Sequence, residues 1–311
     1  MQTHAILLSE PEVLSVSTLT LTEQTEDDVI IQVRHSGIST GTERLLWSGR
    51  MPDFPGMGYP LVPGYETIGE VIGAGDSSDI SIGQTVFVPG SQCFEGARGL
   101  FGGAASRLVV PSKRVMPVPD GLGAEGVLLA LAATAYHAID GGDLLPDLIV
   151  GHGVLGRLVA RLTCALGGAP VVWERDKGRR SGADGYAVCA PDDDDRADYT
   201  LMLDASGDVT LLDRLIGRLA PRGEIILAGF YAERISFAFP PAFMREARLR
   251  VAAEWTPDDL AAVAAMVDSG SLSLGGLITH RAHPSDAASA YRAAFEDRDC
   301  LKMIFDWREL S

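Results

Sequence analysis

Cysteine and basic residues are scarce in this chain. Its four cysteines, Cys93, Cys164, Cys189 and Cys300, lie far apart and form no Cys-x-x-Cys pair. Neither a disulfide framework nor a thiolate zinc site is therefore indicated. The chain has 26 Lys and Arg residues against 42 Asp and Glu residues, which gives a net charge of -16. Such a charge repels phosphate backbones and argues against a nucleic acid as the partner.

Long hydrophobic runs are absent as well. The longest apolar stretch, residues 127–139, is shorter than the roughly 20 residues that a membrane-spanning helix needs. It is interrupted by Thr134, Tyr136 and His137, and it predicts a buried helix. The first ten residues contain neither the basic segment nor the long apolar segment of a signal peptide. We therefore expect a cytoplasmic protein.

A glycine-rich turn stands near the middle of the chain. The apolar residues 146–150 precede it, and the helical pattern of residues 157–162 follows it. In a dinucleotide-binding unit the first glycine makes the turn, the second lets the backbone approach a pyrophosphate, and the third lets the helix pack on the strand. The helix N-terminus adds N–H groups and a positive dipole end. The pattern predicts a dinucleotide site formed by Gly151, His152, Gly153, Val154, Leu155 and Gly156.

The choice of dinucleotide depends on the next apolar strand, residues 169–173. It ends at Glu174, whose carboxylate can accept both ribose hydroxyls and repels a 2′-phosphate, so NAD is the expected cofactor. Four basic residues follow it: Arg175, Lys177, Arg179 and Arg180. They could receive a 2′-phosphate or form a solvated helix face. We assign Arg175 to the cofactor, and also the later strand ends at Ala205 and Gly229.

The position of the glycine turn implies a domain before it. In the first 120 residues, short strands lie between Gly and Pro residues at 28–35, 69–73, 85–89 and 107–111, which suggests a small, partly open barrel. From Gly121 onward helices and strands alternate, as in a doubly wound parallel sheet. The acidic run 192–195 is interpreted as a solvated loop rather than a metal site. Residues 301–306 predict a last strand that returns to the first domain.

This arrangement resembles the medium-chain dehydrogenase/reductase superfamily over the whole chain. The resemblance implies an α/β fold with a GroES-like, β-rich barrel domain, residues 1–122 and 272–311, and a Rossmann domain, residues 123–271. The segments 35–43, 47–52, 54–66 and 253–255 closely resemble one family within it. Members of that family oxidise the C3 1-hydroxyethyl group of a bacteriochlorophyllide to acetyl, with NAD, in bacteriochlorophyll biosynthesis.

The zinc ligands of the superfamily are replaced in this chain. Zinc alcohol dehydrogenases have a cysteine in a Gly-Ile-Cys turn and a histidine in a Gly-His-Glu turn, where this chain has Ser39 and Tyr65. Neither side chain is a normal zinc ligand. Only Cys93 lies in the region that carries four structural cysteines in those enzymes. We therefore expect a metal-free protein, with Glu66 as a weak alternative cation ligand.

Without zinc, hydrogen bonds and a general base have to stabilise the reacting alcohol. The resemblance places Tyr65 and Glu66 in the catalytic pocket, where a phenol beside a carboxylate can relay a proton. Ser39 and Thr40 complete the candidate catalytic set, chiefly as residues that form the pocket. A conjugated macrocycle delocalises the charge that develops during hydride loss, so metal-free oxidation is chemically reasonable.

The implied substrate is flat, apolar and large, so we expect a wide cleft lined by aromatic residues and Met. The candidate substrate-binding residues are Glu43, Trp47, Arg50, Phe54, Met57, Tyr59, Phe101, His137 and Trp255. Arg44 and Arg50 could pair with substrate carboxylates. His35 and His137 could bind the macrocycle magnesium.

Two other functions share the same features. A zinc-independent quinone or enoyl reductase would have the same fold but prefer NADPH, and a pigment carrier would bind nucleotide without catalysis. Glu174 and the motif at 35–66 favour the dehydrogenase over the reductase. The resemblance also suggests a homodimer formed at a sheet edge, and transient contact with other enzymes of the pathway.

Overall fold

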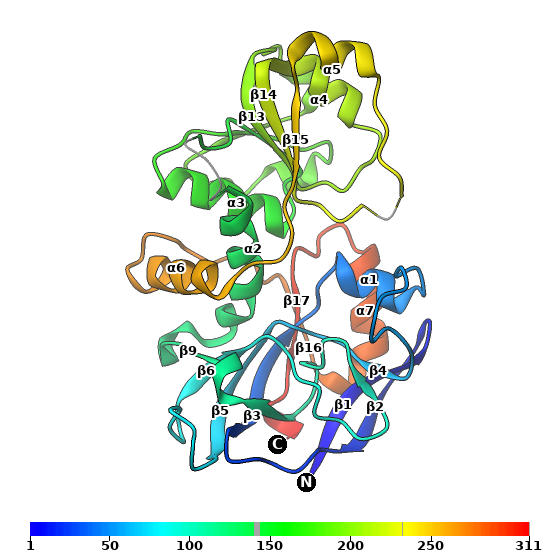
Figure 1. The fold of residues 1–311 in the computed structure, drawn as a ribbon, viewed down its shortest axis with the longest axis vertical. Helices are drawn as coiled ribbons and strands as arrows, with labels where there is room; N and C mark the ends of the chain where they lie inside the picture. The colour runs from blue at the N-terminus through cyan, green and yellow to red at the C-terminus, as the bar shows by residue number, and fades with distance from the viewer. Residues whose placement is uncertain (140–143, 232, 311) are drawn as a thin grey trace. The chain divides into compact units, whose positions relative to one another are not determined.

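The computed structural model describes residues 1–139, 144–231 and 233–310. Contacts divide the chain into two compact units. The first comprises Met1–Ala130 and Gly275–Ser311, and the second comprises Leu131–Leu274. Figure 1 shows both, with the C-terminal segment in red among the blue and cyan strands of the first unit.

The described part of the first unit contains two sheets. The larger has the strand order β16-β17-β3-β5-β6-β9, with β8 paired to β3, and the smaller has the order β2-β1-β4-β7. Their strands are β1 (Gln2–Glu10), β2 (Val13–Thr20), β3 (Asp28–Gly37), β4 (Leu61–Val62), β5 (Thr67–Ala74), β6 (Thr85–Val88), β7 (Arg98–Gly99), β8 (Arg107–Pro111), β9 (Met116–Pro117), β16 (His280–Ala282) and β17 (Met303–Asp306). The helices are α1 (Thr42–Trp47) and α7 (Ala287–Glu296).

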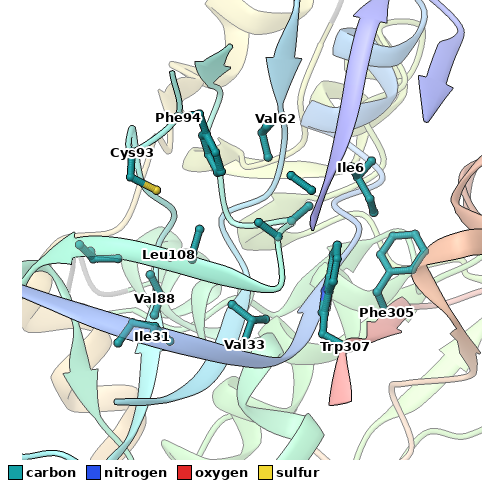
Figure 2. Packing of buried hydrophobic residues seen from close by; sticks show 14 of the residues in the cluster. Ile6, Ile31, Val33, Val62, Val88, Cys93, Phe94, Leu108, Phe305 and Trp307 are labelled. Atoms are coloured by element: carbon teal, nitrogen blue, oxygen red, sulfur yellow. The ribbon is translucent and has the colours of Figure 1, made fainter. Parts of the chain in front are cut away.

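Strand alternation forms the core of this unit. Along β3, Val29, Ile31 and Val33 are buried while the residues between them are half-buried. This follows from the opposite orientation of successive side chains in a strand. Figure 2 shows Ile31 and Val33 in one cluster with Leu108 and Trp307. Because β17 pairs antiparallel with β3, the C-terminal strand returns to the first unit, as the sequence predicts.

The second unit is a parallel α/β sheet with the order β12-β11-β10-β13-β14-β15. All five neighbouring pairs are parallel. The strands are β10 (Leu148–Val150), β11 (Val171–Trp173), β12 (Ala187–Cys189), β13 (Tyr199–Asp204), β14 (Leu219–Leu227) and β15 (Arg248–Val251). The helices are α2 (Leu129–Ile139), which enters this unit, α3 (Val154–Ala165), α4 (Leu212–Arg218), α5 (Phe239–Arg245) and α6 (Pro257–Asp268). The strand order reverses at β10, which confirms the predicted Rossmann topology.

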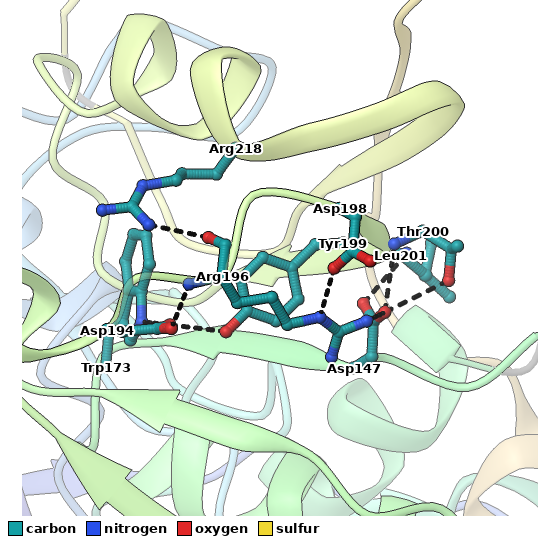
Figure 3. A network of polar contacts seen from close by, with 9 residues as sticks. All are labelled: Asp147, Trp173, Asp194, Arg196, Asp198, Tyr199, Thr200, Leu201 and Arg218. Atoms are coloured by element: carbon teal, nitrogen blue, oxygen red, sulfur yellow. Dashed lines mark hydrogen bonds and ion pairs between the residues drawn. The ribbon is translucent and has the colours of Figure 1, made fainter.

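Two crossovers of this sheet contain 3-10 turns in place of an α-helix: Gly178–Arg180 between β11 and β12, and Pro191–Asp193 between β12 and β13. A polar network lies in the second of them (Figure 3). The carboxylate of Asp194 accepts hydrogen bonds from Trp173 Nε1 and from the Tyr199 hydroxyl, at 2.6 and 2.5 Å. The interpretation of residues 192–195 as a solvated loop is therefore wrong at Asp194. This residue is half-buried and forms hydrogen bonds with the buried side chains of Trp173 and Tyr199.

One helical stretch in the described residues, Asp120–Ile139, is long and apolar enough to cross a membrane by length and composition alone. Its residues from Val127 to Ala130 are all 0% exposed. Such burial is typical of a core helix, which is what the sequence predicts for residues 127–139.

Candidate active site

Two turns far apart in the sequence meet at one end of β3. The N–H of Gly37 donates to the carbonyl of Glu66 at 2.8 Å, and the N–H of Ile38 donates to the carbonyl of Met303 at 3.0 Å. Pairing of β3 with both β5 and β17 brings these backbones together. The turns that carry Ser39 and Tyr65 are therefore held side by side.

The hydroxyls of Ser39 and Tyr65 form a hydrogen bond of 2.5 Å. The Thr42 hydroxyl lies 3.5 Å from the same phenol oxygen. The ring of Phe101 meets the Tyr65 ring edge to face, with centroids 5.3 Å apart. Burial raises the pKa of Tyr65, so the phenol stays protonated and is available as a hydrogen-bond donor. Thr40 is half-buried in the same turn as Ser39.

Glu66 forms a buried ion pair with a residue that sequence reasoning missed. The ammonium group of Lys302 contacts Glu66 Oε2 and donates to the Ile38 carbonyl at 3.0 Å. The two side chains are 0% and 1% exposed. Burial raises the pKa of Glu66, and the charge of Lys302 partly offsets this effect. The available signal was a single charged residue, Lys302, within the apolar strand 301–305.

The side chain of Glu43 forms hydrogen bonds with the backbone of Ser39 and with Tyr291. Its Oε1 accepts the Ser39 N–H at 3.0 Å, and its Oε2 accepts the hydroxyl of Tyr291 in α7 at 2.5 Å. Glu43 is 1% exposed. The predicted role of Glu43 as a substrate contact therefore becomes a proposed positioning role, and Tyr291 joins the site from a part of the chain that the motifs did not include.

Burial raises the pKa of Glu43 from 4.5 to about 7. Protonated Glu43 therefore stabilises the fold fully below pH 4.5, and this contribution is lost as the pH rises toward 7. A shift of this size corresponds to about 3 kcal/mol. We expect the free energy of unfolding of the wild type to fall by that amount, relative to Glu43→Gln, between pH 4.5 and pH 7.5. Urea denaturation across this range measures it, and a constant difference between the two proteins would contradict the expectation.

The aromatic loop 47–60 is divided between core and surface. Trp47, Met57 and Tyr59 pack against a small cluster of buried leucines, and the Tyr59 hydroxyl donates to the Leu46 carbonyl at 2.5 Å. Phe54 is 39% exposed, and Arg50 is exposed. Three of the predicted substrate residues thus help to hold the loop in shape, while Phe54 and Arg50 are accessible to a ligand.

The remaining predicted substrate residues, His137 and Trp255, belong to the second unit. His137 Nδ1 lies 2.9 Å from Asp259 Oδ2. Asp259 also forms a capping box with Thr256 at the start of α6. This carboxylate therefore engages both His137 and the helix N-terminus, and Trp255 is half-buried just before that cap. In the first unit, His35 is buried, and burial lowers its pKa.

The donor chemistry at the two turns does not suit zinc. The hydroxyls of Ser39 and Tyr65 bond to each other, and the carboxylate of Glu66 is paired with Lys302. Zinc prefers thiolate, imidazole and carboxylate ligands in a set of at least three. Across residues 1–139, 144–231 and 233–310, no group of three or more His, Cys, Asp and Glu side chains is arranged to hold a metal ion.

In the second unit, the glycine turn has the geometry of a nucleotide loop. Gly151 has a φ of +97°, and a Cβ on Gly156 would lie 1.8 Å from the Gly151 carbonyl oxygen. A Cβ on Gly153 would meet no atom within 4 Å. Backbone conformation therefore requires the first glycine and packing requires the third, while the space beside Gly153, at the start of α3, suits the close approach of a pyrophosphate.

Glu174 is bonded to the glycine turn itself. Its Oε2 accepts the His152 N–H at 2.9 Å, and its Oε1 accepts the Asp176 N–H at 2.8 Å. Glu174 is 9% exposed. A carboxylate can accept about four hydrogen bonds, so capacity for ribose hydroxyls remains.

The His152 side chain is structural. Its Nδ1 lies 2.6 Å from the Arg179 carbonyl, and its Nε2 lies 2.9 Å from the Tyr186 hydroxyl. The buried guanidinium of Arg157 donates to the carbonyls of His152, Arg179, Ser181 and Gly182. Arg157, which sequence reasoning missed, thus joins the glycine turn to the loop after β11.

The other predicted cofactor residues lie at the same sheet edge. The N–H of Ala205 donates to the Val150 carbonyl at 2.9 Å. A Cβ on Gly229 would lie 3.5 Å from the Ala205 carbonyl carbon. Beside them, buried Asp204 accepts hydrogen bonds from the hydroxyls of Ser206 and Tyr231, at 2.6 and 2.7 Å. The carboxyl ends of β10, β13 and β14 therefore form one polar edge, with Asp204 and Tyr231 as members that the motifs did not reveal.

Comparison with known proteins agrees with this geometry. Residues 25–120 match the alcohol dehydrogenase GroES-like domain. L-idonate 5-dehydrogenase from Escherichia coli has the same fold, with a TM-score of 0.86 and 20% identity over 98% of each chain. These matches show a GroES-like domain and the fold of this class of dehydrogenases.

Closer relatives specify the family. The chain is 55% identical to a protein of Rhodobacter capsulatus and 56% identical to one of Cereibacter sphaeroides, over 99% of this chain and of each relative. Both are named 2-desacetyl-2-hydroxyethyl bacteriochlorophyllide A dehydrogenase. The chain belongs to this family, so the superfamily and family resemblances predicted from the sequence are confirmed.

Proteins of the same fold have been solved with nicotinamide nucleotides. An E. coli dehydrogenase complexed with NADH gives a TM-score of 0.83, at 20% identity over 98% of this chain and 99% of that chain. A dehydrogenase from Sinorhizobium meliloti bound to NADP gives a TM-score of 0.84, with the same identity and coverage.

Proposed function

We propose that this protein oxidises the 1-hydroxyethyl group of a bacteriochlorophyllide to acetyl, with a nicotinamide dinucleotide as hydride acceptor. The relatives at 55% and 56% identity over 99% of the chain carry this proposal. The Ser39–Tyr65 hydroxyl pair and the glycine turn supply the two groups of residues that such a reaction needs.

We further propose that the nucleotide is NAD. The Glu174 carboxylate is held against the glycine turn through the His152 N–H, where it favours ribose hydroxyls over a 2′-phosphate. The residues fit a dinucleotide because the third glycine is required by packing and the second leaves open space at a helix N-terminus.

The chain's own groups account for movement of the proton. A nicotinamide bound at the glycine turn would supply the hydride acceptor: the alcohol carbon would lose a hydride and its oxygen a proton, so that a C=O bond would form. Tyr65 stays protonated, so it can accept that proton only as it donates its own to a neighbouring hydroxyl. Thr42, half-buried and 3.5 Å from the phenol oxygen, can take that proton while it releases its own to solvent. Ser39, 2.5 Å away, holds the phenol in position. Glu66, Lys302 and Glu43 position these groups, and no metal is required.

The test mixes metal-analysed protein with a 3-(1-hydroxyethyl) bacteriochlorophyllide and either NAD or NADP, with and without a chelator. We expect the red absorption band to shift and NADH to form, unchanged by the chelator. No spectral change with either nucleotide would exclude dehydrogenase activity. Loss of turnover with the chelator, restored by zinc, would exclude the metal-free mechanism alone.

The glycine turn offers a matched pair of variants. Gly156→Ala is expected to lower stability by about 2 kcal/mol or more, because its Cβ would collide with the Gly151 carbonyl. Gly153→Ala is expected to change stability by about 1 kcal/mol or less. It should nevertheless weaken NADH binding at least fivefold, because the added methyl group would occupy the space proposed for the pyrophosphate. Thermal unfolding and fluorescence titration with NADH measure the two effects. Equal NADH affinity of wild type and Gly153→Ala would remove the proposed role of this turn.

We also propose that the protein is a cytoplasmic homodimer in which β15 pairs with its copy. In the strand order β15 is an edge strand. Its residue Val251 and the α5 residues Phe239, Phe243 and Met244 are 65% to 78% exposed. Exposed apolar side chains and an open strand edge both favour pairing with a second copy. Sedimentation should show a dimer that Val251→Glu converts to a monomer. Ile82→Glu, at a position of the first unit that is 67% exposed, should leave the dimer intact. A monomeric wild type would contradict the proposal.

A further inference from the structure

An ion pair spans the nucleotide edge of the parallel sheet. Arg175 follows β11, and Asp208 lies in the loop after β13, so the two come from strands on either side of β10. Their Nη1 and Oδ2 atoms are 3.6 Å apart. The loop after β13 lies directly against the glycine turn, because a Cβ on Gly151 would be 3.3 Å from Ser206 Cα. The pair therefore crosses the carboxyl end of β10, where the glycine turn begins.

Asp208 is the fixed partner of this pair. Its Oδ1 accepts hydrogen bonds from the N–H and hydroxyl of Thr210, at 3.0 and 2.6 Å, and its own N–H donates to Ser206 Oγ at 3.1 Å. These bonds and the charge of Arg175 lower the pKa of Asp208, so it is ionised at neutral pH. Arg175, by contrast, has a side chain that is 86% exposed. Its guanidinium is therefore free to change position and to pair with another nearby anion.

We propose that Asp208 is a specificity-determining residue that excludes a 2′-phosphate from the nucleotide site by holding the guanidinium of Arg175. This proposal rests on the proposed NAD-dependent function. Arg175 directly follows the proposed ribose-binding Glu174, and a free guanidinium there would be a strong phosphate ligand. Asp208 neutralises it, so Glu174, Arg175 and Asp208 together present a net negative charge.

The nearby cation Arg180 does not replace Arg175. Its Nε and Nη2 atoms donate to the carbonyls of Glu174 and Arg175, at 2.8 and 2.9 Å. Exposed ion pairs add little to stability. The Arg175–Asp208 pair therefore acts on nucleotide binding, by fixing the position of the Arg175 charge. Selectivity then depends on a loop that the glycine motif does not include.

The experiment measures affinities for NADH and NADPH by nucleotide fluorescence at low ionic strength, without pigment. Asp208→Asn is expected to tighten NADPH binding about tenfold, since the freed Arg175 guanidinium can then pair with the 2′-phosphate, and to change NADH binding less than twofold. The gain should shrink at high salt and disappear in Asp208→Asn with Arg175→Met. Asp192→Asn removes the same charge from another arginine pair of the same unit, with Arg214 at 2.7 Å, and should change neither affinity.

Unchanged NADPH affinity in Asp208→Asn, or an equal gain in Asp192→Asn, would overturn the role of Asp208. Should Asp208→Asn fail to fold, Asp208→Ser tests the same pair, because it likewise frees the Arg175 guanidinium and should tighten NADPH binding while NADH binding changes less than twofold. An equal change for both nucleotides would overturn the proposal. A wild type that binds NADPH more tightly than NADH would instead overturn the proposed use of NAD, so the two failures are distinct.

Discussion

Replacing Lys302 with Met should lower the free energy of unfolding by about 3–5 kcal/mol, because it leaves the Glu66 carboxylate buried without its counter-charge. The variant should regain part of that stability as the pH falls, since protonation then removes the buried charge. Urea denaturation at several pH values measures both effects.

Two further variants show whether the loss of stability comes from the unpaired buried charge. Arg34→Met breaks the ion pair with Glu70, whose side chains are 39% and 37% exposed, and should cost about 1 kcal/mol or less. Combining Lys302→Met with Glu66→Gln should recover stability relative to Lys302→Met alone, because no unpaired charge remains. If Lys302→Met costs no more than Arg34→Met, the buried pair does not hold the two turns together.

Removing the Tyr65 hydroxyl should lower kcat at least tenfold, since a positioned acid–base group typically contributes about 100-fold or more. Tyr65→Phe keeps the ring and its edge-to-face contact with Phe101, so the phenol oxygen and its bond to Ser39 are the main loss. Steady-state turnover of the hydroxyethyl pigment with NAD measures the effect. NADH affinity should stay within twofold of the wild type.

Tyr199→Phe is the control for this variant. It removes a buried phenol oxygen that bonds to Asp194 in the second unit, so it should reduce stability and leave kcat nearly unchanged. Near-normal turnover in Tyr65→Phe would remove Tyr65 from the mechanism. An equal loss of turnover in Tyr199→Phe would show that the effect reports damaged folding and not proton transfer.

Local patterns were sufficient for much of the fold. Alternation in residues 28–35 predicted β3, and the glycine turn followed by an apolar helix predicted β10 and α3. These elements follow from backbone geometry and side-chain period, which act over a few residues. The helix-free crossovers around residues 178–193 escaped prediction, because aromatic rings and a carboxylate from separate strands stabilise that region together.

The candidate site was predictable only in part. Ser39, Tyr65 and Glu66 could be located because they replace the zinc-binding residues of known motifs. Their partners could not, since Lys302 is 236 residues from Glu66 and Tyr291 is 248 residues from Glu43. Glu43 likewise had the polarity of a pocket residue, and only the structure shows that it is 1% exposed and bonded to Ser39 and Tyr291.

The amino-acid sequence by itself determined the class of fold, the dinucleotide turn and the loss of the usual zinc ligands, because each depends on residue type and short spacing. The tertiary structure alone decided which charges are buried together. Lys302 with Glu66, Tyr291 with Glu43, and Asp208 with Arg175 each meet through strand or helix packing. Electrostatic interactions depend on distance and burial, and neither quantity can be read from positions along a chain.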